Sequence, residues 1–449
     1  GRPSAALLPA MPERVFVVGV GMTKFCKPQK GPDPSAPTPG DFARVAITRA
    51  LDDACLKFED VQAAAVGSVF ATQGQKSLYQ MGFNGIPIFN VANACATGSN
   101  AMYLCRSFVA GGLHDCTLAL GIEIMKPGPL GGVQDPGKPK KAPSGPPPPP
   151  AYPDAPKQGD GMTRGVKSMV TKYPIVKAPL NPQMFGNAGR EHNVQYGSTP
   201  EHFAKIGEKN HRHSANNPYS QFRDVYTLDE VKAAPMIYEP LTKLQCSPTS
   251  DGAACAILAS EAFVKKHGLE GQAVEIIGQS MKTDFESVDR GNEPRSCMNS
   301  VGAEMAKAAA DDVYRQTGLG PKDVQVIECH DCFAPNELIT YEALGLAGEG
   351  EGHKIVDSGD VTYGGKWVVN PSGGLISKGH PLGATGLAQC CELNWQLRRE
   401  AGPRQVDNAK VALQHNLGLG GNVVITMYKR PEDFAGVAPK RKISGAMGF

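Results

Sequence analysis

Residues 91–99 read VANACATGS, and this short run changes from apolar, strand-like residues into small residues that open a helix. We therefore expect a strand, a tight turn and a helix, with the thiol of Cys95 at the helix N-terminus. Unpaired backbone N–H groups and the helix dipole stabilise a thiolate there, and the thiolate is the nucleophilic form of cysteine. Cys95 is thus a candidate nucleophile, although a buried structural cysteine is the common alternative.

Predicted strands and helices alternate on both sides of this turn, which is the pattern of a parallel α/β sheet. We predict strands at Arg14–Val20, Val61–Phe70 and Cys116–Gly121, and helices at 41–57 and 97–110.

The pattern occurs a second time along the chain, with matching landmarks in the same order. A helix predicted at 302–318 precedes a strand as the helix at 41–57 does. Because several short matches keep one order, we expect two similar α/β halves. The matched pairs are Asp60-Val61-Gln62 with Asp323-Val324-Gln325, Phe70 with Phe333, Ala96-Thr97-Gly98 with Ala384-Thr385-Gly386, and Thr117–Leu120 with Val411–Gln414.

Composition and charge exclude several classes of protein. The chain has 449 residues, which predicts two or three domains, and 41% of them are hydrophobic. The net charge is +2 without a long basic block, so nucleic acid is not an expected partner. No apolar run reaches the about 18 residues of a transmembrane helix. Twelve scattered cysteines indicate a reducing compartment rather than a disulfide framework.

The region between the two halves has a different composition. Residues 127–156 carry 12 of the 37 prolines, which predicts an exposed polyproline-type insertion; a ligand for a signalling domain is the alternative. Residues 181–244 are polar. We interpret their histidines as surface or loop packing residues and not as metal ligands: His192, His202, His211 and His213.

The ends of the chain bear on localisation. Residues 1–13 contain Arg2 and Ser4 but no acid before Glu13, which is typical of a mitochondrial transit remnant; an artificial extension is the alternative. The last four residues are not a peroxisomal Ser-Lys-Leu signal. We expect a mitochondrial protein, with a peroxisome or related organelle as the alternative.

Three polar clusters in the second half follow an apolar strand or a glycine-rich turn, where α/β sheets present functional groups. Each also has a structural interpretation, since a lone histidine is commonly a hydrogen-bonded core residue and a glycine run is commonly a tight turn. Cys329 and Cys332 form a C-x-x-C spacing, but the chain has no second such pair to complete a zinc site. The clusters are Cys329-His330-Asp331-Cys332-Phe333, Gly379-His380-Pro381 after Asn370-Pro371-Ser372-Gly373-Gly374, and His415–Gly421 (HNLGLGG).

Together these residues have a chemical logic. His380 can act as the base that activates Cys95. His330 can donate a hydrogen bond to a developing enolate or oxyanion, and the backbone N–H groups of Cys95 and Gly418 can form a second oxyanion hole. The thiol of Cys332 can move a proton to or from carbon. This set is suited to making or breaking a carbon–carbon bond next to a thioester.

The motif series N-x-C-A-T-G-S, H-D-C-F, N-P-S-G-G…G-H-P and a final glycine-rich turn resembles the thiolase family over residues 14–430. The H-D-C-F motif is similar to that of the sterol carrier protein-x (sterol carrier protein-2-type) thiolases. The resemblance implies a five-layered αβαβα fold and a homodimer. It also implies 3-oxoacyl-CoA thiolysis in fatty-acid metabolism, or the reverse Claisen condensation, with acyl-CoA and coenzyme A as substrates and neither a tightly bound cofactor nor a metal.

The same resemblance implies residue roles. Cys95 matches the acylated nucleophile, His380 the base and His330 the oxyanion donor. Asn416 occupies the place of the usual second cysteine, so Cys332 becomes the candidate acid/base. For coenzyme A, Ser247 and Ser250 are candidate pantetheine contacts. The cations available for its phosphates are Lys205, Lys209, Arg212, Lys232 and Lys243.

The expected domains follow from this comparison. They are an N-terminal half at 14–121 plus 245–265, a loop domain at 122–244, a C-terminal half at 266–430, and tails at 1–13 and 431–449. A C-terminal lipid-carrier domain is not expected, since the chain ends at Phe449. Two rival functions remain open: a condensing enzyme that uses carrier-protein thioesters, and an inactive protein that binds acyl-CoA or lipid.

Overall fold

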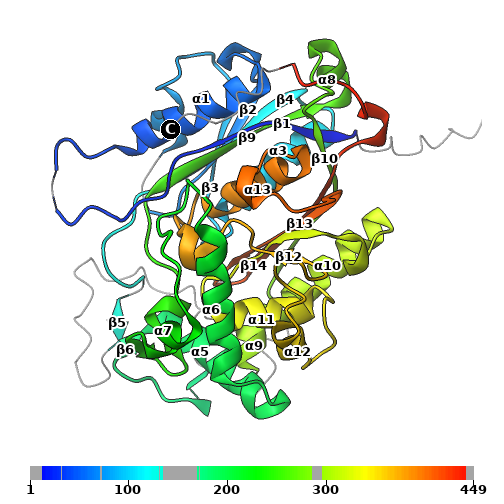
Figure 1. Cartoon of the computed structure of the whole chain (residues 1–449). Coiled ribbons are helices and arrows are strands. Elements are labelled where there is room, and N and C mark those ends of the chain that lie inside the picture. Colours follow the sequence, from blue (N-terminus) through cyan, green and yellow to red (C-terminus); the bar gives the residue numbers. More distant parts are fainter. Residues whose placement is uncertain are drawn as a thin grey trace, which may run out of the picture.

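The computed structural model describes residues 13–31, 33–70, 73–130, 132–134, 169–170, 172–285 and 296–440. Ten strands form one sheet with the order β12-β11-β13-β14-β10-β1-β9-β4-β2-β3. The first half of the chain supplies one end of this sheet and the second half supplies the other (Figure 1).

The N-terminal half contains β1 (Val15–Met22), α1 (Pro39–Ala54), η1 (Phe58–Asp60), β2 (Ala63–Gly67), α2 (Gly74–Leu78), β3 (Ile88–Val91), α3 (Thr97–Ala110), β4 (Cys116–Glu123), β9 (Gly252–Ser260) and α8 (Glu261–His267). The region between contains β5 (Val133–Gln134), β6 (Ala178–Pro179), α5 (Leu180–Tyr196), α6 (Pro200–Ser214), α7 (Leu228–Ala233), β7 (Met236–Tyr238), β8 (Leu241–Thr242) and η2 (Lys243–Gln245).

The C-terminal half contains β10 (Val274–Thr283), α9 (Cys297–Ser300), α10 (Ala303–Thr317), η4 (Pro321–Asp323), β11 (Val326–Glu328), α11 (Ala334–Ala343), α12 (Gly352–Asp357), β12 (Val368–Val369), η5 (Gly374–Lys378), α13 (Thr385–Arg398), η6 (Gly402–Arg404), β13 (Val411–Gly418), β14 (Asn422–Lys429) and η7 (Glu432–Phe434).

The two halves repeat one arrangement, as the sequence predicted. In the first, β2 runs parallel to β3 and β4, and β9 and β1 continue the sheet in antiparallel fashion. In the second, β11 runs parallel to β12 and β13, and β14 and β10 continue it. Even single hydrogen bonds are repeated: Gln62 N–H donates to the carbonyl of Cys116, and Gln325 N–H donates to that of Val411.

Helices separate the strands into layers. Helix α1 covers β1, β9 and β4, while α10 covers β10 and β14. Between the two sets of strands, α3 and α13 pack against each other and contact strands of both halves (Figure 1). This is the expected five-layered αβαβα fold. The halves join through a short antiparallel pairing of β1 with β10, at Phe16 with Glu275 and Val17 with Val274.

The two central helices are held close by small residues. All 14 residues of α13 are buried, so this helix has no solvent-facing side. A Cβ added at Gly121 of β4 would lie 2.1 Å from the carbonyl oxygen of Gly383, just before α13. Glycine is therefore required where the loop before α13 contacts the first half. These close contacts bring the loops of both halves together at one place.

Several local predictions need correction. The sheet is mixed rather than parallel, because each half ends in antiparallel strands. The strand predicted at Val61–Phe70 ends at Gly67, because the carboxylate of Glu123 accepts hydrogen bonds from Ser68 and from the backbone N–H groups of Val69 and Phe70. The chain between 134 and 156, most of the proline-rich stretch, lies outside the described residues.

The interpretation of the four histidines as surface or loop residues is wrong. His192 lies in α5 and the others lie in α6, and all four are buried. Each ring is hydrogen bonded to a distant group; His213, for example, contacts the carbonyl of Asn370 and the hydroxyl of Thr362. His192, His202 and His213 are buried polar contacts between this region and the C-terminal half, whereas His211 contacts Leu244 within the region itself.

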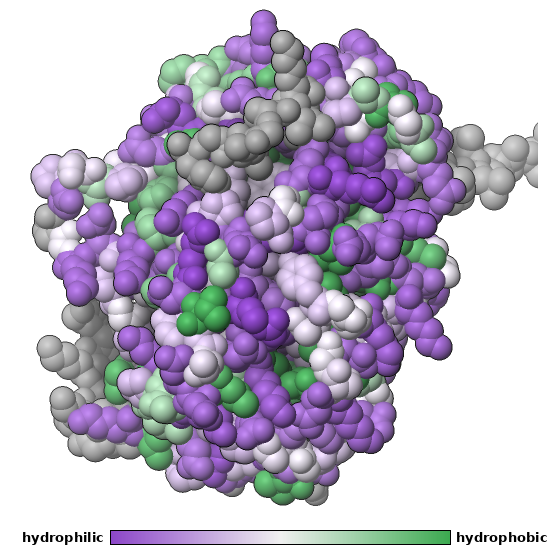
Figure 2. Space-filling view, viewed as in Figure 1, coloured by the Kyte–Doolittle hydropathy of each residue, from purple (hydrophilic) through white to green (hydrophobic). Residues whose placement is uncertain are grey.

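The outer surface is mixed in character. On the face shown in Figure 2, hydrophobic side chains gather in small patches separated by polar ones. Within the described part of the chain, no helix combines the length and hydropathy needed to cross a membrane.

Candidate active site

Cys95 lies in a tight turn between β3 and α3. Ala94, the residue before it, has a φ of 46°, in the left-handed region that L-residues rarely adopt. The hydroxyl of Thr97 accepts a hydrogen bond from the backbone N–H of Asn93 at 2.8 Å and donates to the carbonyl of Ala94 at 2.7 Å. The side chain of Thr97 thus closes the turn that presents the Cys95 thiol.

The resting charge of this thiol differs from the sequence-based expectation. Burial raises the pKa of Cys95 to about 12, although the backbone N–H of Leu419 acts in the opposite direction. The cost of placing a charge in this dry site exceeds what the start of α3 contributes. Cys95 therefore rests as a thiol and needs a base before it can attack carbon.

His380 is placed to act as that base. Its backbone N–H donates to the hydroxyl of Ser250 at 2.9 Å, and its ring Nδ1 lies 2.7 Å from the hydroxyl of Thr385. Since Thr385 donates its proton to the carbonyl of Pro381, its oxygen must accept from Nδ1–H. The Nε2 of His380 is then unprotonated, and it has no hydrogen-bond partner. Burial, and to a smaller extent Lys378, lowers the pKa of His380 to about 3, so the ring is neutral.

His330 follows β11 and is also buried. Its backbone N–H donates to Nδ1 of His415 at 3.3 Å, and its own Nδ1 lies 3.1 Å from the side-chain amide of Asn416. Burial, followed by the neighbouring His380 and His415, holds the pKa of His330 well below its usual range.

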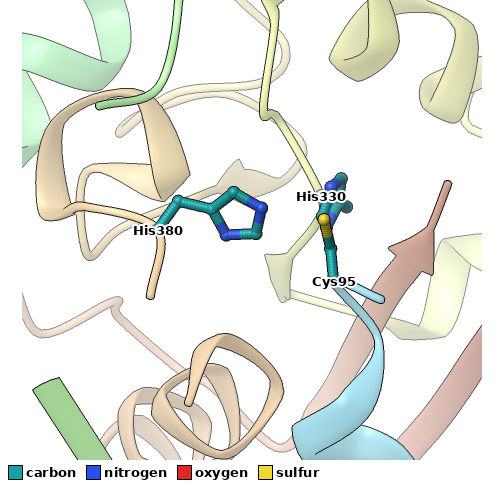
Figure 3. A group of neighbouring side chains, drawn as sticks. All are labelled: Cys95, His330 and His380. Atoms are coloured by element: carbon teal, nitrogen blue, oxygen red, sulfur yellow. The ribbon is translucent and has the colours of Figure 1, made fainter. Parts of the chain in front are cut away.

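The structure brings the three principal candidates together. One side-chain atom each of Cys95, His330 and His380 lies within 4.8 Å of the other two. The two imidazole rings are 5.1 Å apart in an edge-to-face arrangement. Figure 3 shows the His380 ring directed toward Cys95, with His330 behind the sulfur.

Cys332 lies on the loop that carries His330. Burial raises its pKa well above the usual range, and the nearby Cys95 raises it further. The loop is attached to the turn that precedes His380, because the carboxylate of Asp331 accepts backbone N–H hydrogen bonds from Leu375 at 2.6 Å and Ile376 at 3.2 Å. One carboxylate thus fixes two of the site loops relative to each other.

The glycine-rich turn after β13 contributes an amide that sequence reasoning missed. Gly418 was expected to supply an N–H group, and it does lie against the Cys95 turn, with room for no side chain: an added Cβ would lie 2.5 Å from the carbonyl oxygen of Asn93. The backbone N–H groups of the next residue, Leu419, and of Cys95 itself favour the Cys95 thiolate and so act against the effect of burial on its pKa. The glycine run alone does not reveal which of its amides faces the thiol.

The candidate contacts for coenzyme A differ in their surroundings. Ser250 is fully buried and holds the backbone of His380, whereas Ser247 is half-buried and donates its N–H to the carbonyl of Cys332. Lys209 is buried against the carboxylate of Glu337 and cannot meet a phosphate. Of the five candidate cations, Lys205, Lys232 and Arg212 pair with acidic side chains on the surface. Lys243 is exposed and has no ion pair with any residue that the structure describes.

The structure does not support a metal site at the C-x-x-C pair of the sequence. Cys329 and Cys332 do not belong to a group of three potential metal ligands in the described residues. The set that does have such spacing is the cluster of Cys95, His330 and His380 itself. The twelve cysteines are all free thiols.

Comparison with known proteins agrees with this architecture. Residues 15–262 match the family description "Thiolase, N-terminal domain", and residues 291–427 match "Thiolase C-terminal domain-like". Sterol carrier protein 2 of Bos taurus is 55% identical over 422 residues, which cover 93% of this chain and 72% of that protein. An acetyl-CoA acetyltransferase of Methanothermobacter thermautotrophicus is 32% identical, covering 93% of this chain and 99% of that protein.

A solved structure shares the fold. Human mitochondrial 3-ketoacyl-CoA thiolase in complex with CoA superimposes with a TM-score of 0.63 at 20% identity, covering 93% of this chain and 98% of that chain.

The unpaired Nε2 of His380 leads to a prediction about thiol reactivity. Replacing His380 by Ala should slow alkylation of Cys95 by iodoacetamide about 100-fold, since the base that removes the thiol proton is lost. Mass spectrometry of the labelled peptides measures the rate. Cys26, an exposed thiol, serves as the internal control and should react equally in both proteins. An unchanged rate at Cys95 would exclude His380 as its base.

Proposed function

The chain belongs to the thiolase family, whose members are acyltransferases, and from that premise we propose that it cleaves 3-oxoacyl-CoA with coenzyme A. The observation that carries the proposal is the buried cluster of a thiol, an unprotonated imidazole nitrogen and a second imidazole within 4.8 Å. A protein that only bound acyl-CoA would not need a free base next to a thiol. We place the reaction in fatty-acid and lipid metabolism, with the reverse Claisen condensation at the same site.

In the first half-reaction, Nε2 of His380 removes the proton of Cys95, and the sulfur attacks the 3-oxo carbon of the substrate. The bond between C2 and C3 breaks, and the electron pair passes to the enolate of acetyl-CoA. His330 stabilises the thioester oxygen of this enolate. We propose that the Cys332 thiol gives the proton that C2 receives.

In the second half-reaction, the Cys332 thiolate takes the proton of coenzyme A, and the coenzyme A sulfur attacks the acyl group on Cys95. Cys95 leaves as a thiolate and regains the proton held by His380, and the shortened acyl-CoA is released. We propose that the backbone N–H of Leu419, which favours the Cys95 thiolate, also stabilises the oxyanion that forms on the acyl group. We propose that Ser247, at the half-buried edge of the site, contacts the pantetheine. The exposed Lys243, four residues earlier on the same segment, is the proposed contact for a phosphate.

The proposal predicts a covalent intermediate. Incubation with acetoacetyl-CoA should leave an acetyl group on the Cys95 peptide, seen by mass spectrometry, and addition of coenzyme A should remove it. Loss of the thioester without an adduct on Cys95, or no loss at all, would contradict the mechanism. Replacing Cys332 by Ser should lower turnover about 100-fold while the acyl adduct can still form. Replacing Cys329 by Ser, at a buried thiol of the same motif, is the matched control and should leave turnover unchanged.

We further propose a homodimer formed through the β3 edge of the sheet. β3 is the last strand of its half, so among the described residues no strand pairs with one row of its backbone groups. Phe89 on this strand is 41% exposed and packs against Phe108 of α3, and the exposed rings of Tyr79 and Phe83 lie tilted with centroids 4.7 Å apart. Tyr79, Phe83 and Ile88 of β3 line a cavity of about 280 Å³. An apolar edge of this kind is what a second copy could cover.

The dimer proposal predicts that Phe89→Lys yields a monomer, because a charge at the edge opposes strand pairing. Light scattering during size-exclusion chromatography measures the mass. Val194→Lys, at an 87% exposed apolar residue of α5, is the control and should remain a dimer. A monomeric parent protein would end the proposal.

We also propose mitochondrial localisation, with a peroxisome or related organelle as the alternative. Support comes from the acid-free start of the chain and from the mitochondrial origin of a protein that shares the fold.

A further inference from the structure

Asn416 stands where most relatives in the resemblance would carry a cysteine, and it occupies a junction of the site. It is fully buried on β13. Its amide nitrogen lies 3.1 Å from Nδ1 of His330 and 3.2 Å from the carbonyl oxygen of Cys95. Its amide oxygen lies 2.8 Å from the hydroxyl of Ser99, on α3. One side chain therefore contacts the nucleophile's own backbone and the ring of the oxyanion donor.

The direction of this amide is fixed by hydrogen bonds that begin outside the site. The side-chain nitrogen of Gln414 donates to the carbonyl of Gly386 at 2.6 Å, and a carbonyl can only accept. The same nitrogen donates to the hydroxyl of Ser99 at 2.9 Å, so Ser99 must direct its proton elsewhere. That proton goes to the amide oxygen of Asn416. The NH₂ group of Asn416 consequently faces His330.

The start of α13 packs directly against these groups. A Cβ added at Gly386 would lie 2.1 Å from the hydroxyl oxygen of Ser99 and 2.6 Å from the amide oxygen of Asn416. Only glycine at position 386 lets the start of α13 approach the Ser99 hydroxyl and the Asn416 amide this closely. Because all of these groups are buried, water cannot substitute for a missing partner.

The protonation state of His330 follows from this direction. A neutral imidazole has one N–H and one bare nitrogen. Since Nδ1 of His330 accepts a hydrogen bond from Asn416, its proton must be on Nε2. His380 has the opposite arrangement, with its proton on Nδ1 and a bare Nε2. The two neighbouring imidazoles therefore differ in polarity: one can only donate from Nε2 and the other can only accept there.

We propose that Asn416 is a positioning residue that locks His330 as the Nε2–H tautomer, so that His330 donates to the thioester oxygen while His380 alone serves as base. The inference rests on the proposed function for its catalytic meaning, but the tautomer itself can be measured without substrate. The same lock disfavours a metal ion on the three clustered side chains, because the Nε2 of His330 has no free lone pair to offer.

The first experiment measures the tautomer directly. Nitrogen NMR of protein labelled at the histidine ring nitrogens distinguishes a protonated from a bare nitrogen, and His330→Gln identifies the His330 signals by their loss. In the parent protein, Nε2 should carry the proton and Nδ1 should be bare. A proton on Nδ1 would overturn the inference.

Variants of Asn416 then test its role. Asn416→Asp keeps the shape but replaces the donor by an acceptor, so the proton of His330 should move to Nδ1 or both nitrogens should be protonated. Asn416→Ala leaves His330 free to exchange its proton between the two nitrogens. An unchanged Nε2–H signal in both variants would show that Asn416 does not set the tautomer. Should Asn416→Asp fail to fold, Asn416→Ala alone still decides: a mixed signal supports the lock and an unchanged one opposes it.

Turnover gives an independent order of effects. If the tautomer matters, Asn416→Asp should lower kcat about 100-fold and Asn416→Ala about tenfold, with the KM for coenzyme A unchanged. If Asn416 only fills space, the isosteric Asp variant should be the milder one, and that order would overturn the inference. Asn394 is also a buried amide, but it lies on α13. Asn394→Asp therefore measures the general effect of a buried carboxylate and should lower kcat less than Asn416→Asp does. If the parent protein did not cleave 3-oxoacyl-CoA, the proposed function would be wrong. The NMR experiment would still show whether Asn416 sets the tautomer of His330.

Discussion

Exclusion of water from three side chains is the constraint on which the rest of the site depends. Burial raises the pKa of Cys95 to about 12 and lowers that of His380 to about 3, and it acts on His330 in the same direction. Each group is therefore uncharged at rest. When charge cannot distinguish two histidines, only the direction of their hydrogen bonds can, and the fold fixes those directions through Thr385 for His380 and Asn416 for His330. In a buried and uncharged site, the hydrogen-bond donors interact with little screening with an oxyanion when it forms.

The two halves of the fold place a threonine at the start of equivalent helices, and each threonine has a different role in the site. In the first half, the threonine that opens α3 closes the turn around Cys95. In the second half, the equivalent threonine opens α13 and holds the ring of His380. Both threonines use their proton on a carbonyl of the preceding turn, so their oxygens are left to accept. Because α3 and α13 pack against each other, these two turns meet. Cys95, the proposed nucleophile, and His380, its proposed base, therefore come from equivalent places in the two halves.

Much of this could be predicted from the sequence, for reasons that particular residues make clear. The small residues at the helix start and the alternating pattern after them predicted a helix at 97–110, and the observed helix has these bounds. The match between Gln62 and Gln325 corresponds to a backbone hydrogen bond that occurs in both halves. The clustering of Cys95, His330 and His380 could be expected because their motifs lie at strand ends and helix starts. Local pattern suffices for such features.

The remaining features depend on contacts between distant parts of the chain. Asn416 contacts His330 and Cys95 across separations of 86 and 321 residues, so its position was evident but not its direction. Lys209 looked available for a phosphate because its partner, Glu337, is 128 residues away. The charge of Cys95 was misjudged for a related reason: the helix start is visible in the sequence, whereas the burial that outweighs it is not. The turn at Leu419 shows the same limit, since a glycine run does not say which amide faces inward.

The central claim is that Cys95 is uncharged at rest and depends on His380 to lose its proton. Ultraviolet difference spectroscopy of the parent protein against Cys95→Ser measures thiolate absorbance at this one residue across the pH range. The account predicts no Cys95 thiolate at neutral pH and its appearance only in strongly alkaline solution, because a raised pKa must be exceeded before the proton leaves. A full thiolate signal at neutral pH would show a resting ion pair between Cys95 and a histidine and would contradict the account.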